Sequence, residues 1–330
     1  MLYSYVYWNL DAAFVTNTAI CYSDHKTDVE DSCFGEVILM HLKLTAADKT
    51  DVGKQREQNE DSVYKRVESS SEGDNGLFIV ADGMGGYKAG EVASKLAVDT
   101  ISQSLDSFFK PISEQPTLKL SLTDLDPEKT IQLKPLAASP QKTTKLSETP
   151  IFAQMKERLS AAIQQANRVI VRYGEQHHSA GGLGSTVTTV LIQNDLACIA
   201  NVGDSRTYLL RDKKLVPLTH DHSLVAKLVE AKQISPEDVY THPQRNLIYR
   251  SLGAGHKNVE VDVFHETLRA GDRLLLCSDG LWEMIRQQDL LAMLCASSSP
   301  QDICNQLIQQ ANENGGEDNI TAIVVHISAH

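Results

Sequence analysis

The chain has 330 residues, of which 42% are hydrophobic and 22% charged, so it can bury a large core and its composition is neither that of a disordered nor that of a membrane-embedded protein. Lysine and arginine number 31 against 43 aspartate and glutamate residues, which gives a formal net charge of −12. A surface this acidic repels phosphodiester backbones, so we expect no nucleic-acid partner.

The start of the chain lacks the basic region of a signal peptide, because the first lysine or arginine is Lys26. No apolar run approaches the roughly 18 residues of a membrane span. The six cysteines form no C-x-x-C pair and are typical of reduced thiols. We therefore expect a cytoplasmic protein with no membrane association. Residues 1–40 show no helical or strand period and are expected to be an N-terminal extension of unknown role.

A folded domain is predicted over residues 41–330. Leu42 and Leu44 alternate with polar residues as in a strand. Residues 77–81 form a short apolar run between a glycine and an Asp-Gly pair, which is typical of a buried strand. Apolar residues then recur at steps of three to five over 88–109, which predicts an amphipathic helix.

An inserted loop is predicted at about residues 111–150, which hold six of the ten prolines and neither glycine nor an aromatic residue. Such a segment supplies little core and is expected to be mobile. The alternation of Leu118, Leu120 and Leu122 leaves one short edge strand open as an alternative. A second amphipathic helix follows over residues 152–170.

Three strand-like runs follow at 186–192, 196–202 and 206–210. Asn194-Asp195 and Gly203-Asp204 separate them as turns, so the pattern predicts an antiparallel meander.

The last third of the chain begins with a cover segment, residues 221–254, that is polar and helical in places. Meanders with helices grouped between them predict helices outside stacked sheets. The elements expected after the cover are a strand at 273–277, helices at 290–294 and from Pro300, and a strand at 320–327.

Two apolar strands run directly into an Asp-Gly pair, Asp82-Gly83 and Asp279-Gly280. A carboxylate at the end of a buried strand is held rigidly, and the glycine lets a backbone carbonyl turn toward the same site. Such oxygen ligands suit Mg²⁺ and Mn²⁺. Taken singly, each pair is more simply a turn.

Two further acidic triplets lie near strand ends, Asn59-Glu60-Asp61 and Glu317-Asp318-Asn319. Each alone is explicable as a helix cap or a solvated loop. Four carboxylate sites at strand ends are expected to converge at one edge of a sheet sandwich. Because such a cluster repels itself without cations, it predicts more than one divalent metal ion.

Arg56 lies five residues before Asp61 and has two interpretations. It either neutralises the acids as an ion pair or holds a phosphoryl group beside the metals. An arginine next to a two-cation site is the equipment of metal-assisted phosphate hydrolysis. Asp204 is either a further member of the cluster or a turn residue that pairs with Arg206.

Five segments, taken together, resemble in order and approximate spacing the metal-dependent type 2C serine/threonine protein phosphatases of bacteria. They are Arg56 to Ser62, Val80 to Gly86, Gly203 to Arg206, Cys277 to Trp282, and Glu317 to Thr321. The resemblance covers about residues 41–328 apart from the insertion.

The resemblance implies an α+β fold, a four-layer αββα sandwich of two antiparallel β-sheets flanked by helix pairs. It also implies two Mn²⁺ or Mg²⁺ ions in a cleft at one end. By match, Asp82 would bridge the two metals, Asp279 and Asp318 would bind the first, and the Gly83 carbonyl would bind the second.

The same match implies further roles. Glu60 and Asp61 would act largely through metal-bound water, and Arg56 would clamp the phosphate of the substrate. Arg56 and Asp61 are therefore the expected catalytic residues. Asp204, with Asp279 shared, matches the family's ligand for a third, weaker metal site.

Residues 221–254 resemble the flap that bacterial members use in substrate selection. Many eukaryotic members have a histidine where this chain has Met84, and that histidine is a candidate proton donor to the leaving oxygen. Here a metal-bound water or another histidine must donate. The candidates, each also explicable as a surface or capping residue, are His177, His178, His220, His222 and His242.

The predicted activity is hydrolysis of phosphoserine and phosphothreonine by direct attack of a metal-bridging hydroxide, without a covalent phosphoenzyme. No cysteine is followed by an arginine six positions later, so the Cys-x5-Arg nucleophile loop is absent. We expect a monomer whose partners are phosphorylated proteins, namely bacterial serine/threonine kinases or their substrates.

Two other classes of function compete. A metal-dependent nuclease or phosphodiesterase would need a basic surface, against which the net charge argues. An inactive binding module would have lost the metal carboxylates, whereas Asp82, Asp279 and Asp318 are all present.

Overall fold

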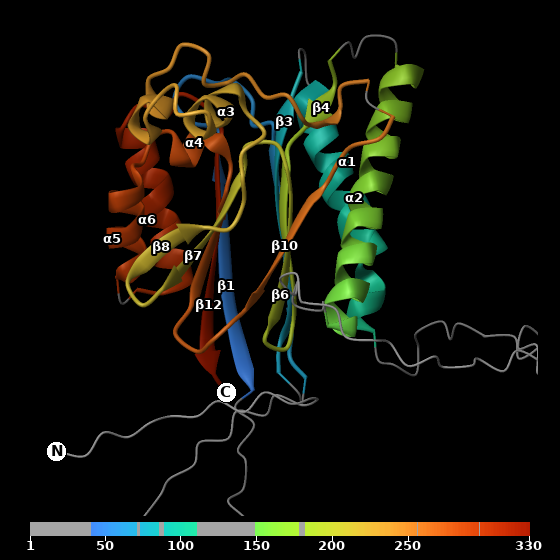
Figure 1. The fold of residues 1–330 in the computed structure, drawn as a ribbon, viewed down its shortest axis with the longest axis vertical. Coiled ribbons are helices and arrows are strands. Elements are labelled where there is room, and N and C mark those ends of the chain that lie inside the picture. The colour runs from blue at the N-terminus through green and yellow to red at the C-terminus, as the bar shows by residue number, and fades with distance from the viewer. Residues whose placement is uncertain are drawn as a thin grey trace, which may run out of the picture. The chain divides into compact units, whose positions relative to one another are not determined.

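Two antiparallel β-sheets stack face to face in this computed structural model (Figure 1). The structure describes residues 41–70, 73–85, 89–110, 149–177, 182–255, 257–296 and 298–330. The predicted extension, the edge strand considered within the insertion, and His178 lie outside these residues. Within them, no helix is long and apolar enough to cross a bilayer.

The first sheet has five strands and the second has seven, and each strand pairs antiparallel with its neighbours. In spatial order the first consists of β1 (Leu42–Asp51), β12 (Ile320–Ala329), β11 (Arg273–Cys277), β7 (Arg206–Arg211) and β8 (Lys214–Pro217). The second consists of β10 (Asp262–Thr267), β6 (Leu196–Val202), β5 (Val187–Gln193), β3 (Asn75–Met84), β4 (Gly184–Ser185) and β9 (Leu252–Gly253), with β2 (Asp61–Glu68) paired to β3.

The central strands are apolar on both faces because both faces are covered. On β3, Phe78 and Val80 pack between the two sheets, while Leu77 and Ile79 pack beneath helices. Successive side chains of a strand point to opposite faces, so one apolar run fills two layers of core. This explains why the strand at 77–81 shows no alternation in the sequence.

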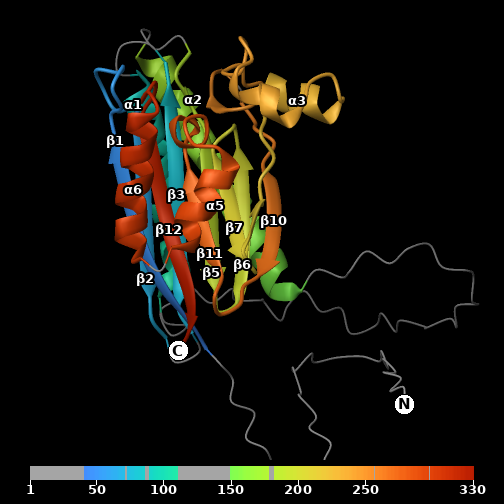
Figure 2. The same ribbon diagram turned by 90° about the vertical axis from the view of Figure 1, so that its left-hand side faces the viewer.

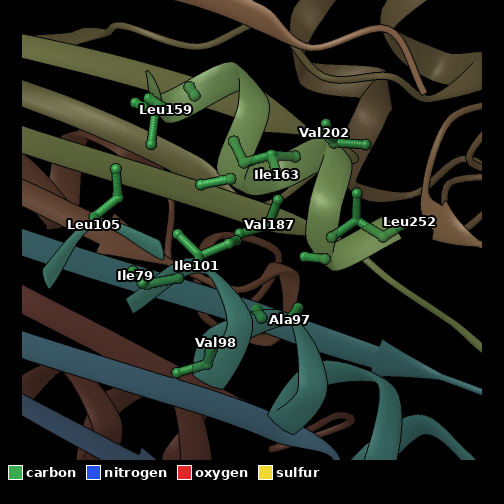
Figure 3. Packing of buried hydrophobic residues seen from close by; sticks show 14 of the residues in the cluster. Ile79, Ala97, Val98, Ile101, Leu105, Leu159, Ile163, Val187, Val202 and Leu252 are labelled. Atoms are coloured by element: carbon green, nitrogen blue, oxygen red, sulfur yellow. The ribbon is translucent and has the colours of Figure 1, made fainter. Parts of the chain in front are cut away.

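Helices cover the outer face of each sheet (Figure 1). The helices α1 (Ala89–Ser104) and α2 (Pro150–Gln176) lie on the seven-stranded sheet, and α5 (Gln287–Cys295) and α6 (Pro300–Glu313) lie on the five-stranded sheet. Figure 3 shows side chains of α1 and α2 meeting those of the sheet. The predicted α+β fold, a four-layer αββα sandwich, is confirmed.

The ends of the helices follow from local chemistry. Thr149 and Ser299 cap α2 and α6 with their side chains, and a proline occupies the first position of each helix. The helix predicted over 88–109 is shorter, since α1 ends at Ser104 and a separate 3₁₀ turn over Asp106–Phe109 follows.

The predicted meander over 186–210 is wrong in its last step. β5 and β6 form the expected hairpin, but β7 pairs with β11 and β8 in the other sheet. The edge of β6 that does not pair with β5 pairs with β10, which lies about sixty residues further along the chain. The chain therefore crosses between the sheets at Gly203, whose φ of 109° is open to glycine.

The cover predicted at 221–254 contains α3 (Leu224–Glu230) and a 3₁₀ helix at Pro236–Tyr240, capped by Ser235. It returns to the sandwich where β9 pairs with β4. In Figure 2, α3 stands beside the edge of the sandwich and apart from the main helix layers. In Figure 1 it lies at the same end as β4 and the short helix α4 (Asp279–Trp282).

Candidate active site

The predicted carboxylates meet at one end of the sandwich because antiparallel pairing brings the end of one strand beside the start of another. Asp61 opens β2 and stands opposite Asp82, near the end of β3. In the other sheet, Cys277 of β11 stands opposite Ala322 of β12. Asp279 and Asp318, just beyond those strand ends, are therefore neighbours.

A cleft of about 210 Å³ opens at this end. Predicted site residues and residues that the sequence analysis did not single out line it together. The predicted ones are Arg56, Glu60, Asp82, Gly83, Asp204, Asp279 and Asp318, and the others include Thr186, Asn246 and Ile248. The sequence-based site is thus assembled by the fold, with one exception.

The exception is Asp61, which is buried and is not among the residues that line the cleft. Its Oδ2 accepts a hydrogen bond of 2.7 Å from the Ser278 hydroxyl, and its Oδ1 has no protein partner. Ser278 in turn accepts a bond from the backbone N–H of Thr321. Asp61 therefore lies behind the cleft wall. Ser278, for which the sequence predicts no role, orients it.

The carboxylates of the cluster hold protons more tightly than ordinary acids. Burial raises the pKa of Asp61 to about 6 and that of Asp204 to about 7. Burial and the neighbouring acids raise the pKa of Asp82 and of Asp279 well above the usual range, and burial also raises the pKa of Glu60. Like charges in a poorly solvated site disfavour ionisation unless a cation offsets them.

These residues fit a site for hard divalent cations. The buried Oδ1 atoms of Asp61 and Asp279 have no hydrogen-bond partner, as free ligand atoms would. The described residues contain no group of three His, Cys, Asp or Glu side chains already arranged to hold an ion. Mg²⁺ and Mn²⁺ sites commonly keep several waters, so a shell that is only partly protein is compatible with them.

Gly83 must be glycine because the chain is crowded there. A Cβ atom at this position would collide with the carbonyl oxygen of Gly90 and lie 2.6 Å from that of Glu60. The backbone N–H of Gly83 donates to the Glu60 carbonyl at 3.1 Å. The end of β3 is therefore packed tightly against the start of α1, with the Gly83 backbone on the cleft.

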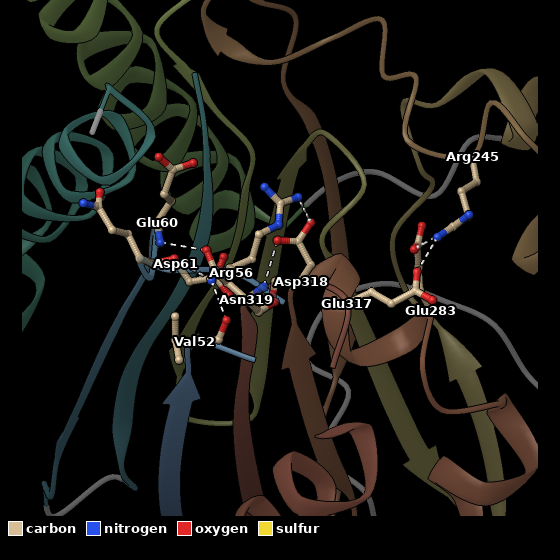
Figure 4. A network of polar contacts seen from close by, with 11 residues as sticks. Val52, Arg56, Glu60, Asp61, Arg245, Glu283, Glu317, Asp318 and Asn319 are labelled. Atoms are coloured by element: carbon tan, nitrogen blue, oxygen red, sulfur yellow. Dashed lines mark hydrogen bonds and ion pairs between the residues drawn. The ribbon is translucent and has the colours of Figure 1, made fainter. Parts of the chain in front are cut away.

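Arg56 takes up one of its two predicted arrangements. Its Nη2 atom donates to Asp318 Oδ2 at 2.6 Å, and 51% of its side chain is exposed (Figure 4). The guanidinium thus sits at the mouth of an acidic cleft, within reach of an incoming anion.

Asp204 belongs to the cleft, and the alternative pairing with Arg206 is wrong. Arg206 instead donates hydrogen bonds of 3.0, 3.1 and 2.7 Å to the Asp221 carboxylate. Its guanidinium carbon lies 3.5 Å from the centroid of the Trp282 ring. The Trp282 indole N–H donates to the Asp204 carbonyl at 3.0 Å. The Asp204 side chain is left facing the acids.

None of the described histidines lines the cleft. His222 is buried, with Nδ1 accepting from the Gly203 N–H at 2.9 Å and Nε2 3.1 Å from Asp262. Its pKa is lowered, chiefly by burial. His222 therefore supports the turn before Asp204, and the cleft wall carries Met84 instead of a histidine.

The segment 221–254 reaches the cleft through Asn246 and Ile248. Arg245 anchors it, donating to Glu283 at 2.9 Å and to Glu317 at 2.7 Å (Figure 4). These glutamates flank Asp279 and Asp318 in the chain, so the cover and the acidic cluster share a support.

A sandwich with a carboxylate-lined cleft and an arginine at its mouth defines a class of protein that handles phosphate esters with divalent cations. Residues 53–321 match the family Protein phosphatase 2C. The serine/threonine phosphatase stp of Listeria monocytogenes is 35% identical over 279 residues, which cover 84% of this chain and 93% of that protein. The chain therefore belongs to the protein phosphatase 2C family.

Solved structures agree with this assignment. The crystal structure of the Mycobacterium tuberculosis serine/threonine phosphatase PstP/Ppp aligns with a TM-score of 0.66 at 33% identity, covering 87% of this chain and 99% of that chain. The catalytic domain of PstP in complex with two manganese ions aligns with a TM-score of 0.65 at 32% identity and the same coverage.

Proposed function

We propose that this protein is a serine/threonine protein phosphatase that requires Mn²⁺ or Mg²⁺. The observation that carries the proposal is the single cleft in which Asp82, Asp279 and Asp318 meet beside Arg56. The names of its relatives as serine/threonine phosphatases support the activity, and the PstP complex with two manganese ions supports the cofactor.

Asp82, the Gly83 carbonyl, Asp279 and Asp318 would hold two cations, with Glu60 and Asp61 beside them and Asp204 at a third, weaker site. Bound there, the cations would acidify a water molecule and draw charge from the phosphoryl oxygens.

The protein's own groups would orient the ester and leave water as the attacking group. Arg56 would turn from Asp318 toward the phosphoryl oxygens, which its planar fork fits. The oxygen of water would bond to phosphorus as the bond to the serine or threonine oxygen breaks, so no phosphoenzyme forms. No described cysteine lines the cleft, and the Thr186 hydroxyl is hydrogen-bonded to the Ser205 hydroxyl.

The proton for the leaving oxygen would come from water, since no described histidine lines the cleft. We further propose that residues 41–330 act as one phosphatase domain, with residues 221–254 as its flap. It would act as a cytoplasmic monomer on phosphorylated proteins, namely serine/threonine kinases or their substrates.

The test is hydrolysis of a phosphothreonine peptide and of para-nitrophenyl phosphate with MnCl₂, MgCl₂ or EDTA. We expect turnover of both substrates with either metal and none with EDTA, because the acidic cleft repels a phosphate ester unless cations occupy it. A folded protein that is inactive with every metal, or that accumulates a stable phosphorylated form during turnover, would contradict the proposal.

Replacing Arg56 by alanine is expected to raise KM for both substrates about 10- to 100-fold, because a charge-assisted hydrogen bond contributes roughly 1.5–3 kcal/mol. Arg56→Lys should recover only part of the loss, since an ammonium group cannot make two parallel bonds. Arg168→Ala on the exposed face of α2 removes the same charge outside the cleft and serves as the control. An unchanged KM in Arg56→Ala would show that Arg56 serves only as an ion pair for Asp318.

A further inference from the structure

Asn319 follows the cleft residue Asp318 and does not itself line the cleft. The residue is 5% exposed, and its side chain makes three hydrogen bonds, all to main-chain atoms (Figure 4). Its Oδ1 accepts from the Glu60 N–H at 2.8 Å. Its Nδ2 donates to the carbonyls of Val52 and Gln58, each at 2.9 Å.

The three partners lie on one loop, residues 52–60, which has neither helical nor strand hydrogen bonding to give it a shape. This loop carries Arg56 and ends at Glu60, so the Asn319 amide forms hydrogen bonds to it on both sides of the arginine. Between these two points, the backbone N–H groups of Lys54 and Gln55 donate to the Gly316 carbonyl, at 2.8 and 3.2 Å.

The connection continues from Glu60 to the end of β3. The Glu60 carbonyl accepts from the Gly83 N–H at 3.1 Å and from the Ser94 hydroxyl at 2.5 Å. The Asn319 side chain, the Glu60 main chain and the Gly83 main chain therefore lie in series. One amide thus joins the segment that bears Asp318 to the segments that bear Arg56 and Gly83.

Only an amide satisfies this arrangement at this length. It supplies one acceptor and two donors at once, whereas a carboxylate only accepts and alanine does neither. In Asn319→Asp, the second carboxylate oxygen would face the carbonyl oxygens of Val52 and Gln58. The aspartate variant therefore keeps the size of the side chain but turns two attractions into repulsions.

We propose that Asn319 is a positioning residue, which fixes the place of Arg56 and of the Glu60 and Gly83 oxygens relative to Asp318. Its effect on catalysis rests on the proposed phosphatase function, but its effect on cation binding does not. A residue that orients ligands from behind typically changes metal affinity or activity by about 10- to 100-fold when it is removed.

The experiment compares the wild-type protein with Asn319→Ala and Asn319→Asp. Calorimetric titration with MnCl₂ measures cation affinity, KM and kcat for para-nitrophenyl phosphate are measured at saturating Mn²⁺, and Tm is measured in EDTA. The matched control is Asn167→Ala, which removes another buried amide that accepts from a backbone N–H, that of Gly253, at 2.7 Å. Asn167 does not line the cleft.

We expect the Kd for Mn²⁺ to rise about 10- to 100-fold in both Asn319 variants, with a raised KM, and Asn319→Asp to be at least as impaired as Asn319→Ala. Asn167→Ala should lower Tm and leave the Kd within twofold of wild type. If the Tm of the Asn319 variants falls as that of the control does, while Kd and KM stay unchanged, the proposal is overturned.

Two further provisions keep the test decisive. If wild type binds Mn²⁺ but hydrolyses nothing, the phosphatase proposal fails, while the Mn²⁺ affinities still decide the role of Asn319. If neither variant folds, Asn319→Ser, whose hydroxyl can bind a water in place of the amide, is held to the same limits on Kd.

Discussion

Asp279→Asn is expected to lower kcat/KM about 10³-fold, because the loss of a carboxylate ligand weakens charge stabilisation worth several kcal/mol and each 1.36 kcal/mol is tenfold in rate. The same substitution should raise the Tm of the metal-free protein. Asp279 carries a buried Oδ1 without a partner and lies among other acids. A neutral amide of the same shape removes that repulsion.

The measurement pairs hydrolysis of para-nitrophenyl phosphate at saturating MnCl₂ with thermal unfolding in EDTA. Asp99→Asn makes the same charge change on the exposed face of α1 and should alter neither quantity. Retained activity, or a metal-free Tm that falls, would be incompatible with a cation site built on Asp279. Opposite changes in activity and stability from one substitution would separate a ligand from an ordinary core residue.

The metal-free protein is expected to lose stability as the pH rises from about 6.5 to 8.5. An acid whose pKa is raised by folding, such as Asp204 at about 7, binds its proton more tightly when folded. Its favourable contribution is complete below the unfolded pKa and is lost as the pH rises through the folded pKa. Asp82 and Asp279, raised well above the usual range, extend the loss to higher pH.

Two histidines with lowered pKa values, His222 and His326, act in the opposite direction, but only at pH values below their unfolded pKa near 6.5. The chosen window therefore lies above the range in which the two histidines act.

Urea unfolding in EDTA at several pH values measures this loss, and Asp204→Asn should reduce the slope. With MnCl₂ in excess the trend should reverse, since cations bind the deprotonated acids. A metal-free free energy of unfolding that is constant or rises between pH 6.5 and 8.5 would refute the prediction.

Much of the fold was readable from local patterns. The apolar runs of β3 and β11 and the caps of α2 and α6 are encoded by residues that are neighbours in the chain. The strand β2 was missed because its burial is partial along most of its length, and β10 was missed because its side chains are mostly half-buried or exposed. Neither strand carries the strong apolar signal that predicts a buried one.

The candidate site divides in the same way. The Asp-Gly pairs after strands, and the resemblance of five ordered segments, were enough to select the charged residues that line the cleft. They did not show that Asp61 lies behind the wall on Ser278, or that Arg206 pairs with Asp221 instead of Asp204. Those outcomes depend on which of several nearby partners the packed chain brings within hydrogen-bonding distance.

The sequence by itself determined the chemical groups, many of the strands and helices around them and the family to which they belong, because those depend on side-chain periodicity and on short ordered motifs. Only the tertiary structure decided that β7 pairs in the other sheet and not with β6, and that Asn319 is hydrogen-bonded to a loop some 260 residues earlier. The reason is physical: a strand edge or an amide takes whichever partner packing leaves available, and packing joins residues that are remote in the chain.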